Sequence, residues 1–350
     1  MDERTHSLRL WHYEWRKLFG GALPVLIALL LLLLGVRGAY LELVLPRTFE
    51  ESLTKDYMAV LEGEVTEEKR QYIQDLKQQI NDIQSQYDPM TKGYEAGNVS
   101  YEEYTAYLTA YRDAANKKDI VEKLQERLWR IDMLAAEGKR ADFVFEAGWE
   151  RILSCEADYC LSVFLILMLS GIYAYEKRCG FCMILHTTKN GRWKTARTKL
   201  CITLLLSIGT ATLSFLYRII LVATSIELSA FSSPAASIAP YESFGGTLLQ
   251  LLLLSGALRI CGAVILGLLC FSLSALFEKT LPVIALTSLS VLTVPLLHVF
   301  DVTVMDELML NGMLGGMSPI LSATGLLSAM LWSSATLLLT MISFWKMKGA

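Results

Sequence analysis

Two cysteines in a cationic loop are the first residues whose spacing suggests chemistry. Cys179 and Cys182 form a C-x-x-C pair within the stretch EKRCGFCMILHTTKNGRWKTARTKL, which runs from Glu176 to Leu200 and holds seven Lys or Arg. Such a pair performs thiol–disulfide exchange when a βαβ fold positions it. Apolar runs long enough to cross a bilayer flank this stretch, so it has no βαβ context. We therefore interpret both cysteines as incidental and expect no redox or metal site here.

The remaining reactive residue types predict no active site. The other five cysteines lie in apolar runs, where cysteine behaves as a small hydrophobic residue (Cys155, Cys160, Cys201, Cys261 and Cys270). Cys155 and Cys160 are five residues apart, which points them away from each other on one helix and disfavours a disulfide. The four histidines are scattered, and the sequence contains no P-loop, H-E-x-x-H or G-x-S-x-G motif. We expect a chain that is not an enzyme and binds no cofactor or metal itself.

Charged residues interrupt the apolar runs at one common depth (Arg37, Asp158, Arg218 and Arg259). Counted from the inner edge of each run at 1.5 Å per residue, all four lie about 27–30 Å from the inner membrane boundary. The sequence therefore predicts a polar layer at the outer edge of the hydrocarbon region. Two interpretations fit this layer. The arginines reach outer headgroups and pair with Asp158 or Glu156, or the layer lines the outer vestibule of a pathway.

Composition and hydropathy predict that the elements carrying these residues are membrane spans. The chain has 350 residues, of which 53% are hydrophobic, and a mean hydropathy of +0.39, which is too apolar for an ordinary soluble domain. Runs close to the 20 residues needed to cross a bilayer must be helical, because lipid offers the backbone no hydrogen-bond partners. We predict an all-α, polytopic fold with six spans at residues 21–43, 153–175, 200–225, 246–276, 281–299 and 319–345.

The distribution of Lys and Arg predicts that both termini lie in the cytoplasm. Segments 226–244 and 301–318 contain five acidic residues and no Lys or Arg, whereas cations gather before the first span, in the 176–199 loop and after the last span. This asymmetry follows the positive-inside rule. About twenty residues precede the first span and no small-residue cleavage site follows it, so it is not a signal peptide. The cationic loop faces anionic lipid headgroups and partner proteins, which excludes nucleic acid as a partner.

Two polar segments flank the first span. Residues 1–20 predict an amphipathic helix in the membrane interface, because Leu8, Trp11, Trp15 and Leu18 fall at helical spacing. Segment 44–152 predicts an acidic extracellular domain, since residues 40–150 hold 23 acidic and 14 basic residues.

Periodicity within the acidic segment predicts an antiparallel helical hairpin with coiled-coil packing. Thr66 is a candidate N-cap for a first helix, and Ser100 with Glu103 forms a capping box for a second. Each helix carries an apolar stripe with steps of three and four residues. Pro89, Gly93 and Gly97 predict the break between the helices.

This order of elements resembles the membrane subunit of ABC-2-type ABC transporters, over nearly the whole chain. The loop between spans two and three carries the closest likeness. In the family pattern an acid ends the second span, and then come a glycine, a short apolar helix, a Gly-Arg turn and a lysine that enters the third span. The matching residues here are Glu176, Gly180, Met183, Ile184, Leu185, Gly191, Arg192 and Lys199.

The resemblance implies a function for each part of the chain. The 176–199 loop would be a coupling helix that docks in a groove of a separate cytoplasmic ATPase subunit, and a dimer of that subunit would hold ATP and Mg²⁺. A second permease subunit, alike or different, would complete a pathway in a bacterial plasma membrane. The substrate implied is amphipathic or lipophilic, such as a peptide. Three other interpretations stay open: a loop that only anchors to anionic lipid, a receptor or scaffold that transports nothing, and a mechanical transmitter that moves the external domain.

Overall fold

The computed structural model describes residues 3–19, 22–45, 49–153, 158–178, 191–298, 310–315 and 323–349. Over these residues the chain is helical and forms no β-strand, which confirms the all-α prediction for the described part. The chain divides into two compact units. Unit 1 comprises residues 1–45, 151–225 and 252–350, and unit 2 comprises residues 46–150 and 226–251.

Within the described residues, four helices of unit 1 are long and apolar enough to cross a membrane. They are Pro24–Leu43 in α2 (Ala22–Leu43), Trp193–Ser225 in α11 (Gly191–Ser225), α12 (Leu248–Leu276) and Gly325–Trp345 in α16 (Ala323–Gly349). Two shorter apolar helices, Tyr159–Ala174 and Thr280–Thr293, match the second and fifth predicted spans. The second belongs to α13 (Thr280–His298). The structure therefore describes a membrane protein with four candidate spans of full length.

The second predicted span is shorter than the sequence indicates because its helix is interrupted. Leu153 ends α7 (Glu146–Leu153), and the apolar helix α8 (Tyr159–Leu169) begins only after Asp158. The Asp158 carboxylate caps α8 by accepting a hydrogen bond from the Leu161 amide at 3.0 Å. After Ser170 the chain continues as α9 (Gly171–Arg178).

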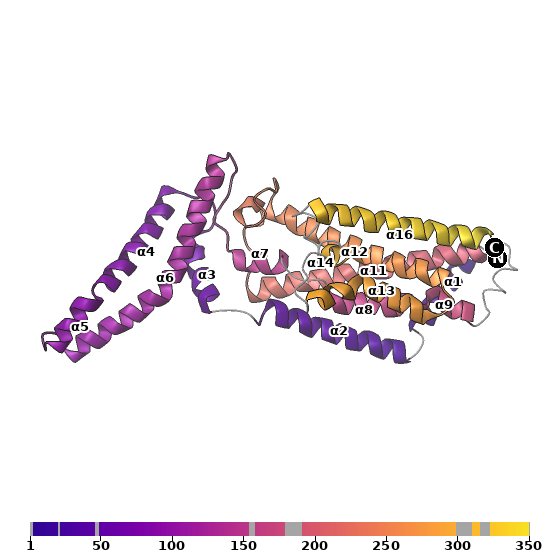
Figure 1. Ribbon diagram of the computed structural model, residues 1–350, viewed down its shortest axis with the longest axis horizontal. Helices are drawn as coiled ribbons and strands as arrows, with labels where there is room; N and C mark the ends of the chain where they lie inside the picture. The colour runs from indigo at the N-terminus through magenta and orange to yellow at the C-terminus, as the bar shows by residue number, and fades with distance from the viewer. Residues whose placement is uncertain are drawn as a thin grey trace. The chain divides into compact units, whose positions relative to one another are not determined.

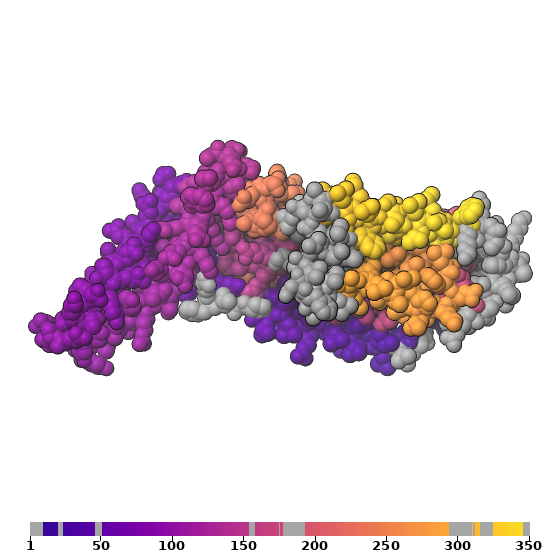
Figure 2. All heavy atoms as spheres, viewed as in Figure 1, coloured from indigo at the N-terminus to yellow at the C-terminus, as the bar shows by residue number. Residues whose placement is uncertain are grey.

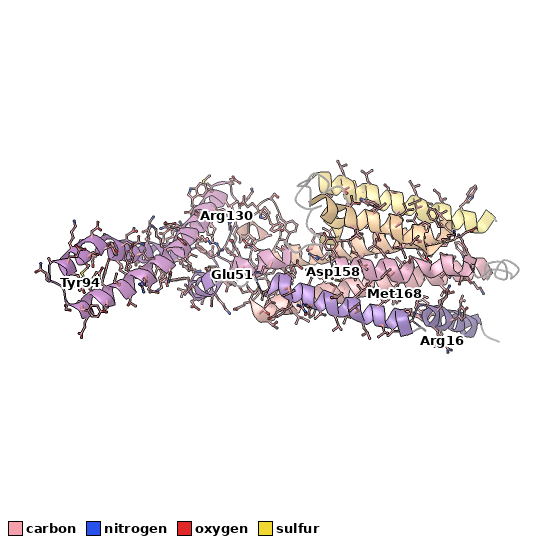
Figure 3. The ribbon with its side chains drawn as sticks, turned by 60° about the horizontal axis from the view of Figure 1, so that its bottom comes forward. Arg16, Glu51, Tyr94, Arg130, Asp158 and Met168 are labelled. Carbon is pink, nitrogen blue, oxygen red and sulfur yellow. The ribbon has the colours of Figure 1, made fainter. Side chains whose placement is uncertain are left out.

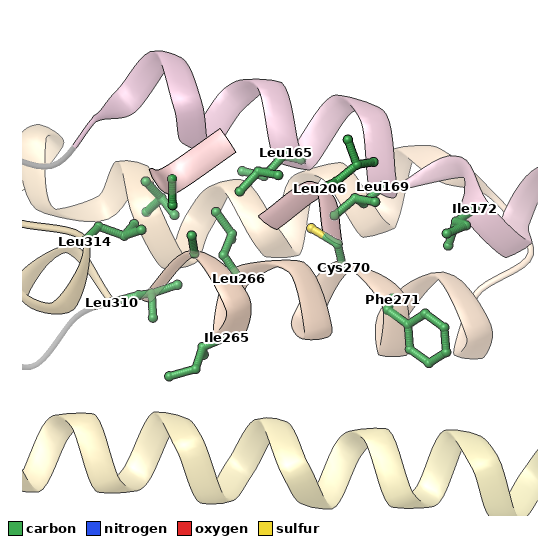
Figure 4. Packing of buried hydrophobic residues seen from close by; sticks show 14 of the residues in the cluster. Leu165, Leu169, Ile172, Leu206, Ile265, Leu266, Cys270, Phe271, Leu310 and Leu314 are labelled. Carbon is green, nitrogen blue, oxygen red and sulfur yellow. The ribbon is translucent and has the colours of Figure 1, made fainter. Parts of the chain in front are cut away.

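The core of unit 1 lies between α8, α11 and α12. Figure 4 shows side chains of α8 and α9 facing Leu206 of α11 and the α12 residues Leu266, Cys270 and Phe271. Leu310 and Leu314 close the cluster from the short helix α14 (Asn311–Gly315) and the residue before it. These residues are buried, and full burial of each such side chain contributes roughly 1.5–3 kcal/mol.

Large apolar side chains also cover the outside of unit 1. Most leucines of α2 are exposed, and α16 exposes a row that includes Leu327, Leu331, Leu338 and Trp345. Figure 2 shows α16, in yellow, lying on the surface of this unit. A helix that is apolar on every side and exposed is suited to a lipid environment.

Close packing of α11 on α12 depends on Gly267. A Cβ atom at this position would lie 2.1 Å from Ser207 Oγ and 3.3 Å from Thr203 Cγ2, both on α11. Replacing Gly267 by Val is therefore expected to destabilise unit 1 by about 1–3 kcal/mol through overpacking. Gly209 is the matched control, since nothing lies within 4 Å of a Cβ atom there. Thermal unfolding of the purified variants in detergent measures the difference, and equal midpoints for G267V and G209V would contradict this packing.

Unit 2 contains the predicted hairpin. Its helices are α3 (Phe49–Leu61), α4 (Glu67–Ser85), α5 (Tyr87–Glu95) and α6 (Tyr101–Ala136), and Figure 1 shows α4 and α6 side by side with α5 at the tip. Both predicted caps are confirmed: Thr66 Oγ1 accepts from the Lys69 amide at 3.4 Å, and Ser100 and Glu103 form a complete capping box. Ile80 of α4 packs against Ala114 and Val121 of α6.

The predicted break at Pro89 is wrong. Pro89 and Gly93 lie inside α5, and the chain turns at Gly97, which has a φ of +74°. Proline is tolerated in the first turn of a helix, because the amide there has no intrahelical acceptor. Pro89 is the third residue of α5, so it starts a helix instead of ending one.

The second segment of unit 2, residues 226–251, is a part that sequence reasoning missed. We expected a short loop at 226–244, but it packs onto the first segment through named contacts. The Trp149 indole donates to the Ser229 carbonyl at 3.0 Å, and its ring meets Phe231 edge to face at 5.2 Å. The Asp142 amide donates to Ser237 Oγ at 2.8 Å. Two chain segments separated by 75 residues of unit 1 therefore complete one domain.

A buried ion group holds this junction within unit 2. Glu146 of α7 accepts from Arg130 at 2.5 Å and lies 3.1 Å from Arg127, both of which belong to α6. The Arg130 guanidinium also donates to the Ser237 carbonyl at 2.9 Å, and Figure 3 labels this residue on its helix. The Glu146 carboxylate is buried, and both half-buried guanidinium groups lie against it, so its charge is paired as burial of an ion requires.

The hairpin is expected to fold without the rest of the chain. A fragment covering residues 61–134 should be soluble and predominantly helical by circular dichroism, because α4 and α6 bury their apolar stripes against each other. Replacing Ile80 by Ala should lower its stability by about 2–4 kcal/mol, since that side chain is 6% exposed. A fragment that is mostly unstructured would show that the hairpin depends on residues 226–251.

Candidate functional site

Four charged side chains meet in the interior of unit 1, and we call them the charge cluster: Glu14 and Lys17 of α1 (Glu3–Phe19), Glu176 of α9 and Lys199 of α11. Lys199 is 0% exposed, Glu14 2% and Glu176 4%. Charged groups are rarely buried to this degree unless they are paired. The cluster joins three helices that are distant in sequence.

Glu176 is the centre of the cluster. One of its carboxylate oxygens accepts from Lys17 Nζ at 2.8 Å, and the other accepts from Lys199 Nζ. Both ammonium groups also donate to the Ile172 carbonyl, at 3.3 Å from Lys17 and 2.7 Å from Lys199. Charge-assisted bonds of this kind are roughly twice as strong as neutral ones.

The two remaining contacts complete the surroundings of the lysines. Glu14 lies 3.8 Å from Lys17, one helical turn earlier on α1. Lys199 Nζ lies 4.2 Å from the centre of the Tyr173 ring, which places a cation over an aromatic face. The cluster has two acidic and two basic side chains, so it is neutral when all four are ionised.

The two carboxyl groups have opposite pKa shifts. Burial alone would raise the pKa of Glu176, but Lys199 and Lys17 outweigh it by charge and hydrogen bonding and hold that pKa below its ordinary value. Burial raises the pKa of Glu14, and the two lysines offset this only in part. Glu176 therefore keeps its charge, and Glu14 is the member that takes up a proton more readily.

The charge cluster holds both ends of the 179–190 segment. Glu176 stands three residues before that segment, and Lys199 stands in the α11 helix that Gly191 and Arg192 begin. Of the other predicted coupling residues, Gly180, Met183, Ile184 and Leu185 lie outside the described residues, as do Cys179 and Cys182. The structure thus places Glu176 in a contact with Lys199, and leaves the docking surface itself a prediction.

Helix α1 also differs from an interfacial helix surrounded by lipid. Trp11, Trp15 and Leu18 pack against the core cluster of unit 1, and Trp15 stacks on Phe19 at 5.3 Å. These three members of the predicted stripe therefore face protein, whereas the side chain of Leu8 lies outside the described part of the structure. Sequence reasoning missed the role of Glu14 and Lys17, although Glu14 is one of few acids in a cationic helix and stands one turn from Lys17.

The outer polar layer includes a pair that we did not predict, whereas the predicted partner Glu156 lies outside the described residues. Arg218 of α11 bonds Glu42 of α2 at 3.0 Å, an acid that we had not included. Asp158 accepts from Ser214 Oγ at 2.5 Å in addition to capping α8. The Arg259 guanidinium lies 5.9 Å from the Phe215 ring centre. Asp158 and Arg259 thus contact residues 214 and 215 of α11, one turn from Arg218 on the same helix. Arg37, by contrast, is exposed.

The described residues offer no alternative site for chemistry. No group of three or more His, Cys, Asp or Glu among them is arranged to hold a metal ion. Among the described residues, Cys160, Cys201, Cys261 and Cys270 are free thiols. Comparison of the chain with family models, with curated proteins and with solved structures found no significant match.

Proposed function

We propose that this chain is the permease subunit of an ABC-2-type exporter in a bacterial plasma membrane. In this proposal the four long and two shorter apolar helices cross the membrane six times, with both termini and the 176–199 loop in the cytoplasm. Unit 2 is then extracellular. The chain contains no P-loop, so the nucleotide chemistry belongs to a partner ATPase that binds ATP and Mg²⁺.

The assembly of unit 2 from two separate chain segments supports the proposed topology. The segment after the first span and the segment after the third span fold into the same unit. Segments that share a folded domain must lie on the same side of a membrane. The positive-inside asymmetry independently assigns both segments to the outside.

The charge cluster is the observation that carries the proposal. A coupling loop must transmit the motion of the ATPase to the spans. Local bending of the loop would absorb that motion. Here both ends of the loop are bonded to each other through Glu176 and Lys199, and to α1 through Lys17. Since these bonds are buried, they are screened little by water or salt. The loop, α1 and the ends of two spans therefore move as one body when the ATPases close.

The substrate class follows from the spans in this proposal. Predicted spans four to six contain no acidic residue, so they offer no ion-binding site. An amphipathic or lipophilic compound, such as a peptide, fits apolar helices better than an ion does. The outer polar layer around Arg218 and Asp158 would receive the polar part of such a compound.

The test is purification of the tagged chain from its native membrane in mild detergent. We expect a stoichiometric partner whose sequence carries a P-loop and an LSGGQ-like signature, and ATP hydrolysis by the complex in lipid vesicles. Hydrolysis should vanish when the P-loop lysine of the partner is replaced. A chain that purifies without any ATPase under conditions that keep it monodisperse would support the receptor or scaffold interpretation instead.

A further inference from the structure

A pocket of about 430 Å³ lies in unit 1, beside the charge cluster. Its volume falls within the roughly 300–1,000 Å³ typical of small-molecule sites. The lining combines polar residues of α1 with apolar residues of α1, α2 and α8, and consists of Tyr13, Arg16, Lys17, Leu18, Pro24, Leu167, Met168 and Gly171. Figure 3 labels Arg16 and Met168, which stand on two of its walls.

Arg16 gives the pocket a positive charge that no acidic side chain of the described residues neutralises. Its side chain is exposed and forms no ion pair with any residue of the described ranges. Lys17, by contrast, is already bonded to Glu176. A guanidinium presents planar donors that match a phosphate group with two parallel hydrogen bonds. The Tyr13 hydroxyl, on the same helix, offers a further donor.

The apolar walls of the pocket fit hydrocarbon, and their position fits headgroup depth. Leu18, Leu167 and Met168 present aliphatic surface next to the guanidinium. Pro24 is the first residue of the apolar stretch of α2, and Gly171 lies near the end of the apolar stretch Tyr159–Ala174. The pocket thus straddles the point where apolar helices give way to cationic sequence, which is where lipid phosphates lie.

We propose that this pocket binds one anionic phospholipid, with the phosphate on Arg16 and Tyr13 and an acyl chain along Leu167 and Met168. The site does not depend on the transport function. It would add a lipid to the surface that α1 shares with α2 and α8, beside Lys17 of the charge cluster. A lipid bound here contacts α1, α2 and α8 together and therefore stabilises the packing of α1 on these apolar helices.

Native mass spectrometry of the purified full-length chain tests the proposal. The probes are phosphatidylglycerol and phosphatidylcholine with identical acyl chains, titrated after the chain has been stripped of lipid in detergent. The wild-type chain should retain one phosphatidylglycerol in preference to phosphatidylcholine. Arg16→Gln should weaken phosphatidylglycerol binding by about tenfold or more, the loss expected for one charge-assisted contact.

Arg197→Gln is the matched control, because Arg197 is an exposed arginine on α11 that does not line the pocket. It should change phosphatidylglycerol binding by less than about twofold if the pocket is specific. Equal losses in both variants would show that surface charge alone attracts the lipid and would overturn the proposal. No preference in the wild-type chain would overturn it too. Displacement of the lipid by millimolar inorganic phosphate would assign the pocket to a free anion rather than a lipid.

Discussion

Replacing Glu176 by Gln is expected to destabilise unit 1 by about 3–5 kcal/mol, because it leaves two ammonium groups with the single carboxyl of Glu14. Lys199 is fully buried, so water cannot take over the lost bonds. The thermal midpoint of the purified chain should fall by on the order of 10 °C. Membrane insertion should be unchanged, since the substitution leaves the apolar runs and all of the cations that orient them in place.

A double-mutant cycle separates the ion pair from a general loss of packing. Lys199→Met alone should also be costly, because Glu176 then keeps only Lys17 as a cationic partner. The double variant E176Q/K199M should lose less than the sum of the two single variants, with a coupling of about 0.5–3 kcal/mol. Arg197→Gln removes an exposed charge from the same helix and should stay within about 0.5 kcal/mol of wild type. Additive losses in the cycle would mean that Glu176 and Lys199 contribute independently, which the geometry does not allow.

Replacing both Met183 and Leu185 by Asp is expected to abolish co-purification of the ATPase. In the proposed function these side chains enter an apolar groove on the partner, and a charge buried there costs several kcal/mol, enough to dissociate a typical subunit interface. ATP hydrolysis measured on the purified chain should disappear together with the partner.

The control for this experiment is the pair Cys179→Ser and Cys182→Ser in the same loop. This variant should retain the ATPase and its activity, because we assign the thiols no role. Both variants should keep the thermal midpoint of wild type, since neither replaces a residue of the charge cluster. If the serine variant loses the ATPase while the aspartate variant keeps it, the thiols are functional and the coupling proposal fails.

Local features of this chain were predictable from sequence, and long-range pairs were not. The Thr66 and Ser100 caps depend on residues three positions away, so the sequence contains all that determines them. The charge cluster depends on Lys17 meeting Glu176 across 159 positions, and no periodicity encodes such a meeting. Sequence reasoning therefore identified Glu176 as the end of a span, and the fold supplied its partners.

The same limit explains the outer layer and residues 226–251. Depth along a span can be counted at 1.5 Å per residue, which is why the sequence predicts one common level for Asp158 and Arg218. Rotation about each span cannot be counted in this way, so the bond between Arg218 and Glu42 was missed. Residues 226–244 were expected to be a loop, and residues 246–251 were expected to begin the fourth span. The attachment of segment 226–251 depends on Trp149 and Arg130, which lie 80 and 107 positions from their acceptors.

The two-segment construction of unit 2 imposes an order on biosynthesis. The hairpin of α4 and α6 is complete as soon as residue 136 has been synthesised. The Trp149 indole and the Arg130 guanidinium find their carbonyl acceptors only after Ser229 and Ser237 have been synthesised and, in the proposed topology, have crossed the bilayer. In the proposed topology the third span must therefore insert before unit 2 can close. Once closed, the domain is too large and too polar to return through the membrane. It therefore fixes the orientation of the first four spans for the lifetime of the protein.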